Sequence, residues 1–576
     1  MRYLFFLFAS FSIFSTNAQT EGLNINGRIS DGISGEPLPY VTLIQLKTKR
    51  GTISNSDGYF SFENLVVGDS IQFSFIGYQN FIFIATEGND LDIKLMPEIN
   101  LLNAVTILYN TDFLNELIQK CRKTKNNRSK IAKTYFSLAS YYQNQRVEML
   151  EAYYNGHFVG HDVRNLDLKN GRIALLEKEN RFFISSETSV ALCRYTSFKR
   201  NDLFPKNPLE LSKRKLDKFF KLNLNEKYLD PKGRVVYVIS CQPKLDSKAA
   251  FHSTFWIDSS SAELIRLKLE IIDAKIHPFI SLSGKSTLSQ VDLSLGKSFI
   301  SIDGETFLKT MDFDYKLKYK TTSDSVFEVK SEAVLYAYNF ENAFTLPYFE
   351  FSNGSYEDYR NINASPYNKD FWKRSEEFTL NDDPLKSQVF IDNSATIDNR
   401  KLFSSNPIFK NGFFEHPYVF WSERRVAFRP ANENLQQEKR DALPTNRYNL
   451  AVQVYMDYSI FNDSIYYNIA TVFDPFQTYS YLPETPTTAA FINIYFDLME
   501  IEKRKLVRLL NQSNITEIDI EDIYLKCKKE REIISKEYFK QVQRGTNWQG
   551  MLLWNNRVLD QLGIDNIGLF ELQDPD

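Results

Sequence analysis

The sequence predicts a multidomain α+β protein in which antiparallel β-sheet dominates. Aromatic residues, mostly Phe and Tyr, make up 15% of the 576 residues, and such residues cover pleated, half-buried strands well. Strand-like runs separated by turn residues fill most of residues 22–346. The longest helical patterns instead gather near the C-terminus. These observations favour several domains over a single repeated unit.

The first residues predict a secretory signal peptide. Arg2 supplies a positive charge, Leu4–Phe14 is apolar, and the small residue Ala18 follows a short polar stretch. The apolar run is too short to span a bilayer, and no later apolar run approaches the ~18 residues that a membrane helix needs. We expect cleavage near Ala18 and an exported mature chain without a transmembrane helix. Its expected location is the periplasm or the periplasmic face of the outer membrane.

Charge and cysteine content narrow the function classes. The formal net charge is -3, so no strong field attracts nucleic acid. The four cysteines, Cys121, Cys193, Cys241 and Cys527, are far apart and form no CxxC pair. Export permits disulfides, and buried free thiols are an equally good interpretation.

Residues 22–108 predict a small antiparallel β-sandwich. Strand-like runs alternate with turns every eight to twelve positions, and Asp57-Gly58 supplies the positive φ of a tight turn. The expected strands are Leu23–Ile29, Tyr40–Leu46, Tyr59–Phe62, Ser70–Ile76 and Asn80–Ala85. Short strands with regular turns are typical of a sandwich.

The motifs "INGRISDGISGEPLPYVTL", "GTISNSDGYFSF" and "SFIGYQN" resemble the carboxypeptidase-regulatory-like domain of many exported Bacteroidetes proteins. The usual trailing segment appears as "INLLNAVTIL", with Asn103-Ala104 where an acidic residue is common. The resemblance implies a transthyretin-like or Ig-like seven-strand sandwich without catalytic residues of its own. In that family the domain is an accessory that often precedes outer-membrane receptors or other envelope proteins.

The sequence argues against a zinc carboxypeptidase. None of the five histidines lies in an HxxE or HExxH pattern. His157 and His161 form an HxxxH pair, but on a strand their Cα atoms would lie roughly 13 Å apart, too far to chelate one ion. We therefore expect no metal site, no cofactor and no motif-borne catalytic residue.

Residues 109–346 predict an antiparallel-sheet α+β domain. A helix is expected at "TDFLNELIQKCRK", with an apolar face that includes Leu114, Leu117 and Ile118. Two series of strands follow, and the consecutive long strands of the second series, with the turn after Asp258, loosely resemble the curved half-barrel of periplasmic lipoprotein carriers. A sheet of that kind around Phe251 to Tyr319 would hold either an apolar ligand or a packed core. The acidic pair Asp312 and Asp314 is expected on a solvated face.

Residues 347–447 are rich in Asn, Pro, Ser and aromatic residues, and they predict a loop-rich wrap or linker. Within them lies a cluster able either to stack on a ligand or to pack between domains. The weak ligand-contact candidates are Phe420, Trp421, Arg424, Arg425 and Phe428.

Residues 448–576 predict strands followed by a helical domain. The strongest helix, "TTAAFINIYFDLMEIEKRKLVRLL", is expected to be capped by Thr487 or Thr488. Its apolar stripe contains Phe491, Ile494, Tyr495, Leu498, Ile501 and Leu509. Gly563 is expected to end the last long helix.

Together these features predict a non-catalytic exported cell-envelope protein that acts in binding or assembly. The expected partner is an outer-membrane or other envelope protein. Two alternatives remain: an envelope hydrolase whose site is dispersed along the chain, and a periplasmic carrier of an apolar or lipid-like ligand.

Overall fold

The computed structural model describes residues 23–97, 111–350, 361–372, 419–422 and 448–573, with short gaps inside these ranges. The chain divides into two compact units, and the division falls after Pro97. The first unit contains the N-terminal strands. The second contains the remaining described elements. The expected domain limits at 108, 346 and 447 remain predictions.

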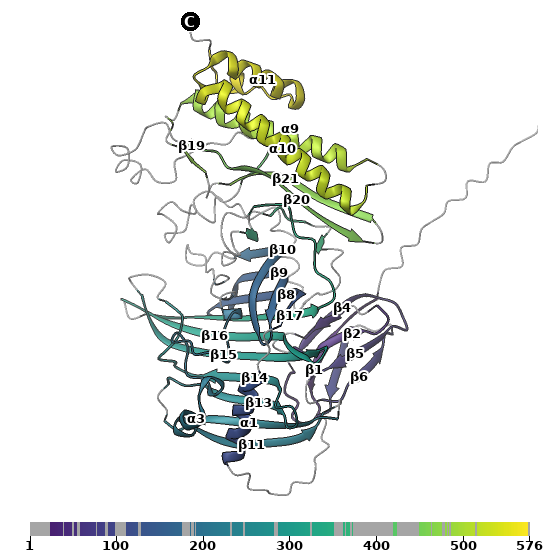
Figure 1. The fold of residues 1–576 in the computed structure, drawn as a ribbon, viewed down its shortest axis with the longest axis vertical. Helices are drawn as coiled ribbons and strands as arrows, with labels where there is room; N and C mark the ends of the chain where they lie inside the picture. The colour runs from purple at the N-terminus through teal and green to yellow at the C-terminus, as the bar shows by residue number, and fades with distance from the viewer. Residues whose placement is uncertain are drawn as a thin grey trace, which may run out of the picture. The chain divides into compact units, whose positions relative to one another are not determined.

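The first unit is a sandwich of two sheets (Figure 1). One sheet has the order β4-β1-β7 and the other the order β3-β2-β5-β6. The strands are β1 (Leu23–Asp31), β2 (Thr42–Gln45), β3 (Gly51–Ile53), β4 (Tyr59–Leu65), β5 (Ser70–Ser74), β6 (Phe81–Ile84) and β7 (Asp90–Leu95). The five runs expected from the sequence are strands, and β3 and β7 complete the set.

Both sheets contribute to one apolar core, which contains Ile25, Leu43, Phe60 and Phe73. The rings of Phe60 and Phe73 meet edge to face across the two sheets, with centroids 5.3 Å apart. All pairs are antiparallel except β1 with β7, which run parallel. The expected positive φ is present at Gly58, where φ is 79°.

The second unit is built on one antiparallel sheet of ten strands, in the order β10-β9-β8-β17-β16-β15-β14-β13-β12-β11 (Figure 1). Because β17 pairs with β8, the two strand series of the sequence form a single sheet. The strands are β8 (Ser129–Tyr142), β9 (Gln145–Val159), β10 (Asp162–Leu175), β11 (Phe220–Leu229), β12 (Val235–Pro243), β13 (His252–Asp258), β14 (Leu264–Ile271), β15 (Ser286–Ile302), β16 (Glu305–Thr321) and β17 (Val326–Asn339).

Short helices cover part of this sheet. They are α1 (Thr111–Lys123), a 3-10 turn (Pro208–Glu210) and α3 (Lys213–Phe219). Leu114, Leu117 and Ile118 of α1 are buried in the large core of the sheet, as their spacing predicted.

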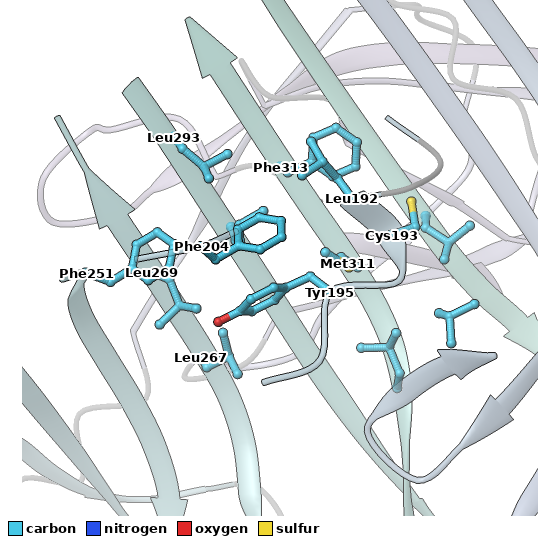
Figure 2. Packing of buried hydrophobic residues seen from close by; sticks show 14 of the residues in the cluster. Leu192, Cys193, Tyr195, Phe204, Phe251, Leu267, Leu269, Leu293, Met311 and Phe313 are labelled. Carbon is cyan, nitrogen blue, oxygen red and sulfur yellow. The ribbon is translucent and has the colours of Figure 1, made fainter. Parts of the chain in front are cut away.

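The face of the sheet that carries Leu267, Leu269, Met311 and Phe313 is filled by the chain itself. Figure 2 shows Leu192, Cys193, Tyr195 and Phe204, from the segment between β10 and β11, lying against these strand residues. All eight side chains belong to one cluster and are at least nine-tenths buried. The region between Phe251 and Tyr319 therefore contributes to a packed core, which was one of the two outcomes expected from the sequence.

The C-terminal part places a long helix against a small sheet (Figure 1). The sheet has the order β18-β21-β20, and a separate pair joins β19 to β22. The elements are β18 (Val419–Phe420), β19 (Tyr448–Asn449), β20 (Val452–Phe461), β21 (Ser464–Phe473), β22 (Tyr479–Ser480), α9 (Pro486–Leu510), α10 (Glu517–Val542), a 3-10 turn (Gln543–Gly545), α11 (Trp548–Leu562) and α12 (Asn566–Leu569).

Helix α9 is buried on all sides over much of its length. Every residue from Ala490 to Glu502 is buried, because the small sheet covers one side while α10, α11 and α12 cover others. The helix begins earlier than expected: Thr485, and not Thr487 or Thr488, is its N-cap. The Thr485 hydroxyl accepts the Thr488 N–H at 3.2 Å, and Pro486 occupies the first turn. Gly563 ends α11 with a φ of 74°, as predicted.

No helix in the described ranges has both the length and the apolar content needed to cross a membrane. All four cysteines are buried free thiols. Burial alone raises the pKa of the Cys121 thiol to about 12, so it stays protonated at neutral pH.

Candidate functional site

The histidine pair does not form a metal site. His157 lies on β9 and its Nε2 is 2.7 Å from Asp167 Oδ2. His161 instead packs between the rings of Phe198 and Phe299. Within the described ranges, no three His, Cys, Asp or Glu side chains gather closely enough to hold a metal ion.

A buried ion pair joins the ten-stranded sheet to the C-terminal sheet. The pairing of β10 with β9 skips Lys169, which forms a β-bulge. A bulge re-aims its side chain, and the Lys169 Nζ reaches Asp457 on β20. It also donates to the carbonyl oxygens of Thr345, at 2.7 Å, and Tyr458, at 2.8 Å. The two side chains are only 3% and 1% exposed.

Burial dominates the titration of this pair. It lowers the pKa of Lys169, and attraction to Asp457 partly opposes that shift. It likewise raises the pKa of Asp457, with Lys169 opposing. Since both groups are sealed from solvent, the pair has no access to a substrate in this structure. Its chemistry is that of a junction between two sheets.

A second charged group lies on the same edge of the ten-stranded sheet. Arg172 Nε donates to Glu151 Oε2 at 2.7 Å, and the Tyr135 hydroxyl donates to Glu151 Oε1 at 2.6 Å. The Arg172 guanidinium lies 4.1 Å from the centre of the Trp372 ring. On the other face, Ile362 packs where a side chain at Gly171 would have to go. Ile362 and Trp372 thus lie against opposite faces of β10, the edge strand.

A buried carboxylate, Glu148, lies within the large core and is hydrogen-bonded. It accepts the Ser185 N–H at 2.9 Å and the Ser140 hydroxyl at 2.7 Å. Ser140 also contacts Ser331 at 2.9 Å. These bonds fasten the segment at Ser185 to three neighbouring strands, and they offset the cost of burying the charge.

Two of the five ligand-contact candidates lie in the described residues. Phe420 packs with Tyr455 and Val472. Trp421 donates its Nε1–H to Asp497 Oδ1 at 2.8 Å, and the Arg504 guanidinium lies 5.3 Å from its ring centre. Both side chains are half-buried and face the chain's own residues. Arg424, Arg425 and Phe428 lie outside the described residues, so ligand contact by this cluster remains a prediction.

A group of exposed apolar side chains in the described part of the first unit lies at strand β6. Phe81, Ile82 and Ile84 are 39%, 55% and 58% exposed. Val66 and Val67 are 69% and 60% exposed and lie in the turn beside the end of this strand. Two hydrogen bonds hold the turn there: the Gly68 N–H donates to the carbonyl of Ala85, and the Ala85 N–H donates to the carbonyl of Asp69. We call these five residues the β6 patch; Phe81 lies on the strand face toward the core, and Ile82 and Ile84 lie on the opposite face. Exposed apolar groupings of this kind mark interaction sites.

Sequence inspection found β6 as a strand but missed the patch. The available signal was the run "FIFI", in which four apolar residues follow one another without the usual alternation. That run is also compatible with a fully buried strand, and only the edge position of β6 leaves it open to solvent.

The two-sheet fold of the N-terminal unit agrees with a comparison with known protein families. A family model described as "CarboxypepD_reg-like domain" matches residues 25–107. Residues 25–107 therefore form a CarboxypepD_reg-like domain, as the sequence motifs predicted.

Among curated proteins, the chain is similar to TonB-dependent receptor P39 of Formosa agariphila, with 35% identity over 106 residues. The match covers 18% of this chain, and the chain spans 10% of the length of that receptor. It supports the predicted resemblance to Bacteroidetes proteins for the N-terminal domain.

Several solved structures align with part of the chain. The MucA/MucB complex of Pseudomonas aeruginosa aligns at 8% identity and a TM-score of 0.14, covering 38% of this chain and 93% of that one. A LolA superfamily protein from Nitrosomonas europaea aligns at 9% identity and a TM-score of 0.15, covering 40% of this chain and 93% of that one. A putative outer-membrane lipoprotein-sorting protein domain from Vibrio parahaemolyticus aligns at 12% identity and a TM-score of 0.17, covering 46% of this chain and 97% of that one. TM-scores this low carry no argument about this chain.

Proposed function

We propose that this protein is a non-catalytic, exported protein of the cell envelope that binds another envelope protein through its CarboxypepD_reg-like domain. The observation that carries the proposal is the β6 patch, whose five large apolar side chains are exposed on a small folded domain. The signal-peptide pattern at Arg2 to Ala18 supports export. The similarity of 106 residues of the chain to part of a TonB-dependent receptor supports an envelope setting for the partner.

The two alternative hypotheses have less support. A hydrolase needs reactive groups in contact with substrate, whereas the buried charges at Lys169 and Asp457 are sealed. A carrier needs a cavity, whereas side chains such as Tyr195 and Phe204 occupy the inner face of the large sheet. The polar network and the packed core instead suit a structural role for the second unit.

The proposal is tested by mild crosslinking and capture from the native envelope. Three forms are compared: the full mature chain, a chain lacking residues 22–108, and the full chain with Ile82→Lys. We expect one envelope protein to be captured by the full chain and lost from both altered forms. Ile280→Lys, which makes the same change at a side chain that is 82% exposed in the second unit, is the matched control. Equal capture by all forms would show that the domain is not the docking element.

A further inference from the structure

Strand β6 has one backbone edge that faces away from its sheet. In the described part of the chain it pairs with β5 alone, and it is the last strand of the order β3-β2-β5-β6. Ala85 donates its N–H to the carbonyl oxygen of Asp69. Because hydrogen-bonded positions alternate along an antiparallel strand, Phe83 and Phe81 also direct their backbone groups toward β5. The N–H and C=O groups of Ile82 and Ile84 therefore point away from β5, in position to bond to a further strand.

The register also separates the side chains of β6 into two faces. Phe81 and Phe83 lie opposite Phe73 and Ile71, which are buried between the sheets. Ile82 lies opposite Gln72 on the outer face. Consequently both faces of the open edge are apolar, and a chain laid along it would meet apolar side chains above and below.

No charged residue is present in β5 or β6, whose sequences are "SIQFS" and "FIFI". The edge strand β7 of the other sheet carries Asp90, Asp92 and Lys94, with the outward positions exposed. Charges of that kind protect edge strands from pairing with other chains. Among the four edge strands of the two sheets, β7 is thus protected by charge, whereas β6 is not.

We propose that β6 is a strand-addition site that accepts an extended, uncharged segment with alternating apolar residues from another envelope protein. This inference rests on the proposed function and specifies how the docking domain recognises its partner. Backbone bonds to Ile82 and Ile84 would supply affinity, and contacts with the β6 patch would supply specificity.

A second copy of the chain fits the edge less well. A stable dimer interface takes about 800 Å² and about 20–30 residues per partner, whereas the β6 patch has five side chains around a four-residue strand. Strand addition depends less on area, because main-chain hydrogen bonds provide much of its affinity.

The test is amide hydrogen–deuterium exchange in the full chain. The probe is a short, end-blocked peptide of alternating valine and threonine at millimolar concentration. Its control is the same peptide N-methylated at every residue, which keeps the side chains but blocks main-chain pairing along both of its edges. We expect the unmethylated peptide to slow exchange of the Ile82 and Ile84 amides several-fold, and the methylated peptide to have no such effect. Ile82→Lys should abolish the protection, and Ile280→Lys should leave it unchanged.

The alternative outcomes are distinct. Equal protection by both peptides would overturn strand addition while leaving apolar docking, and with it the proposed function, intact. Absence of protection by either peptide would also overturn strand addition. Wild-type dimers that Ile82→Lys dissociates in sedimentation would assign the edge to a second copy. Binding to phospholipid vesicles that Ile82→Lys abolishes would assign the patch to a membrane surface. Failure of the proposed function itself would appear separately, as unchanged capture by the Ile82→Lys protein.

Discussion

At the scale of single residues, the structure depends on buried groups that sequence inspection did not identify. Lys169 is an ordinary lysine in the pattern of β10, and Asp457 an ordinary acid in that of β20. They meet because a bulge directs the Lys169 side chain toward a strand that lies 288 residues later in the chain. Asp457 Oδ2 has no hydrogen-bond partner among the described residues, so the pair depends strongly on Lys169.

Replacing Lys169 by Met should destabilise the second unit by ~3–5 kcal/mol, because the Asp457 carboxylate would be left buried without its cation. The double variant Lys169→Met, Asp457→Leu should recover most of that loss, since no buried charge remains. Urea denaturation followed by Trp fluorescence measures both. A double variant no more stable than Lys169→Met would contradict this role for the pair.

A second residue-scale prediction concerns pH. Asp312 lies against Gly296 on the neighbouring strand, and burial raises its pKa above the ordinary 3.8, with Arg266 and Lys268 partly opposing. Below pH 3.8 the carboxyl is protonated in both the folded and unfolded chain. As the pH rises, the unfolded chain ionises first, so the folded state loses stability until the pH passes the raised pKa.

Asp312→Asn removes this pH-dependent loss of folding stability, because the amide does not ionise. Near pH 3.5 the free energy of unfolding of the variant should equal that of the wild type within the error of the measurement. At pH 7 the variant should be more stable than the wild type by roughly 1 kcal/mol or less. Denaturation midpoints across that pH range provide the check. A difference that does not change with pH would show that the carboxylate is not strained by burial. The sequence expectation of a solvated acidic pair is met only in part: Asp314 is exposed, yet burial raises its pKa to about 6, and Asp312 is partly buried.

At the scale of elements, local signals predicted the type of most helices and strands and were less certain about their ends. The motif around α1 predicted a helix with the buried face that is observed. For α9 the apolar stripe was found, yet the helix is buried all round from Ala490 to Glu502. Hydrogen bonds offset the cost of burying the polar residues of this helix. Asp497 accepts hydrogen bonds from Trp421 and Asn566. Glu500 accepts one from the Thr471 hydroxyl.

The start of α9 gives an element-scale prediction. Thr485→Ala should destabilise the C-terminal helices by ~1 kcal/mol, because the Thr488 N–H loses its acceptor. Thr487→Ala is the matched control, since Thr487 follows the cap and should change stability by less. Thermal unfolding followed by circular dichroism at the helix band compares the two. A larger effect at Thr487 would move the cap back to the position that the sequence suggested.

At the scale of the whole molecule, two compact units each have their own apolar core. Such units unfold as separate cooperative blocks when few interactions couple them. We expect scanning calorimetry of the full chain to resolve at least two transitions, one of them belonging to the CarboxypepD_reg-like domain.

Gly27→Ala distinguishes these transitions. A Cβ at Gly27 would lie 2.2 Å from the Leu91 carbonyl oxygen, where β1 and β7 pair in parallel, so the backbone would have to shift. The transition of the first unit should fall by several degrees, as expected for a loss of ~2 kcal/mol in a small domain, while the other transition stays in place. Asn26→Ala, at the exposed neighbouring position, is the control. A shift of every transition together would show that the two units unfold as one.

By itself the sequence determined the N-terminal domain class, the antiparallel character of the middle and the helical C-terminal end, because turn residues, strand periodicity and helix stripes act over a few neighbouring positions. Only the tertiary structure decided that two strand series join through β8 and β17, that the inner face of the large sheet is filled by Tyr195 and Phe204, and that Lys169 meets Asp457. It also left the edge of β6 unpaired among the described strands. Such features depend on which distant segments meet, and the free energy of those contacts comes from burial and from hydrogen bonds that no local pattern records.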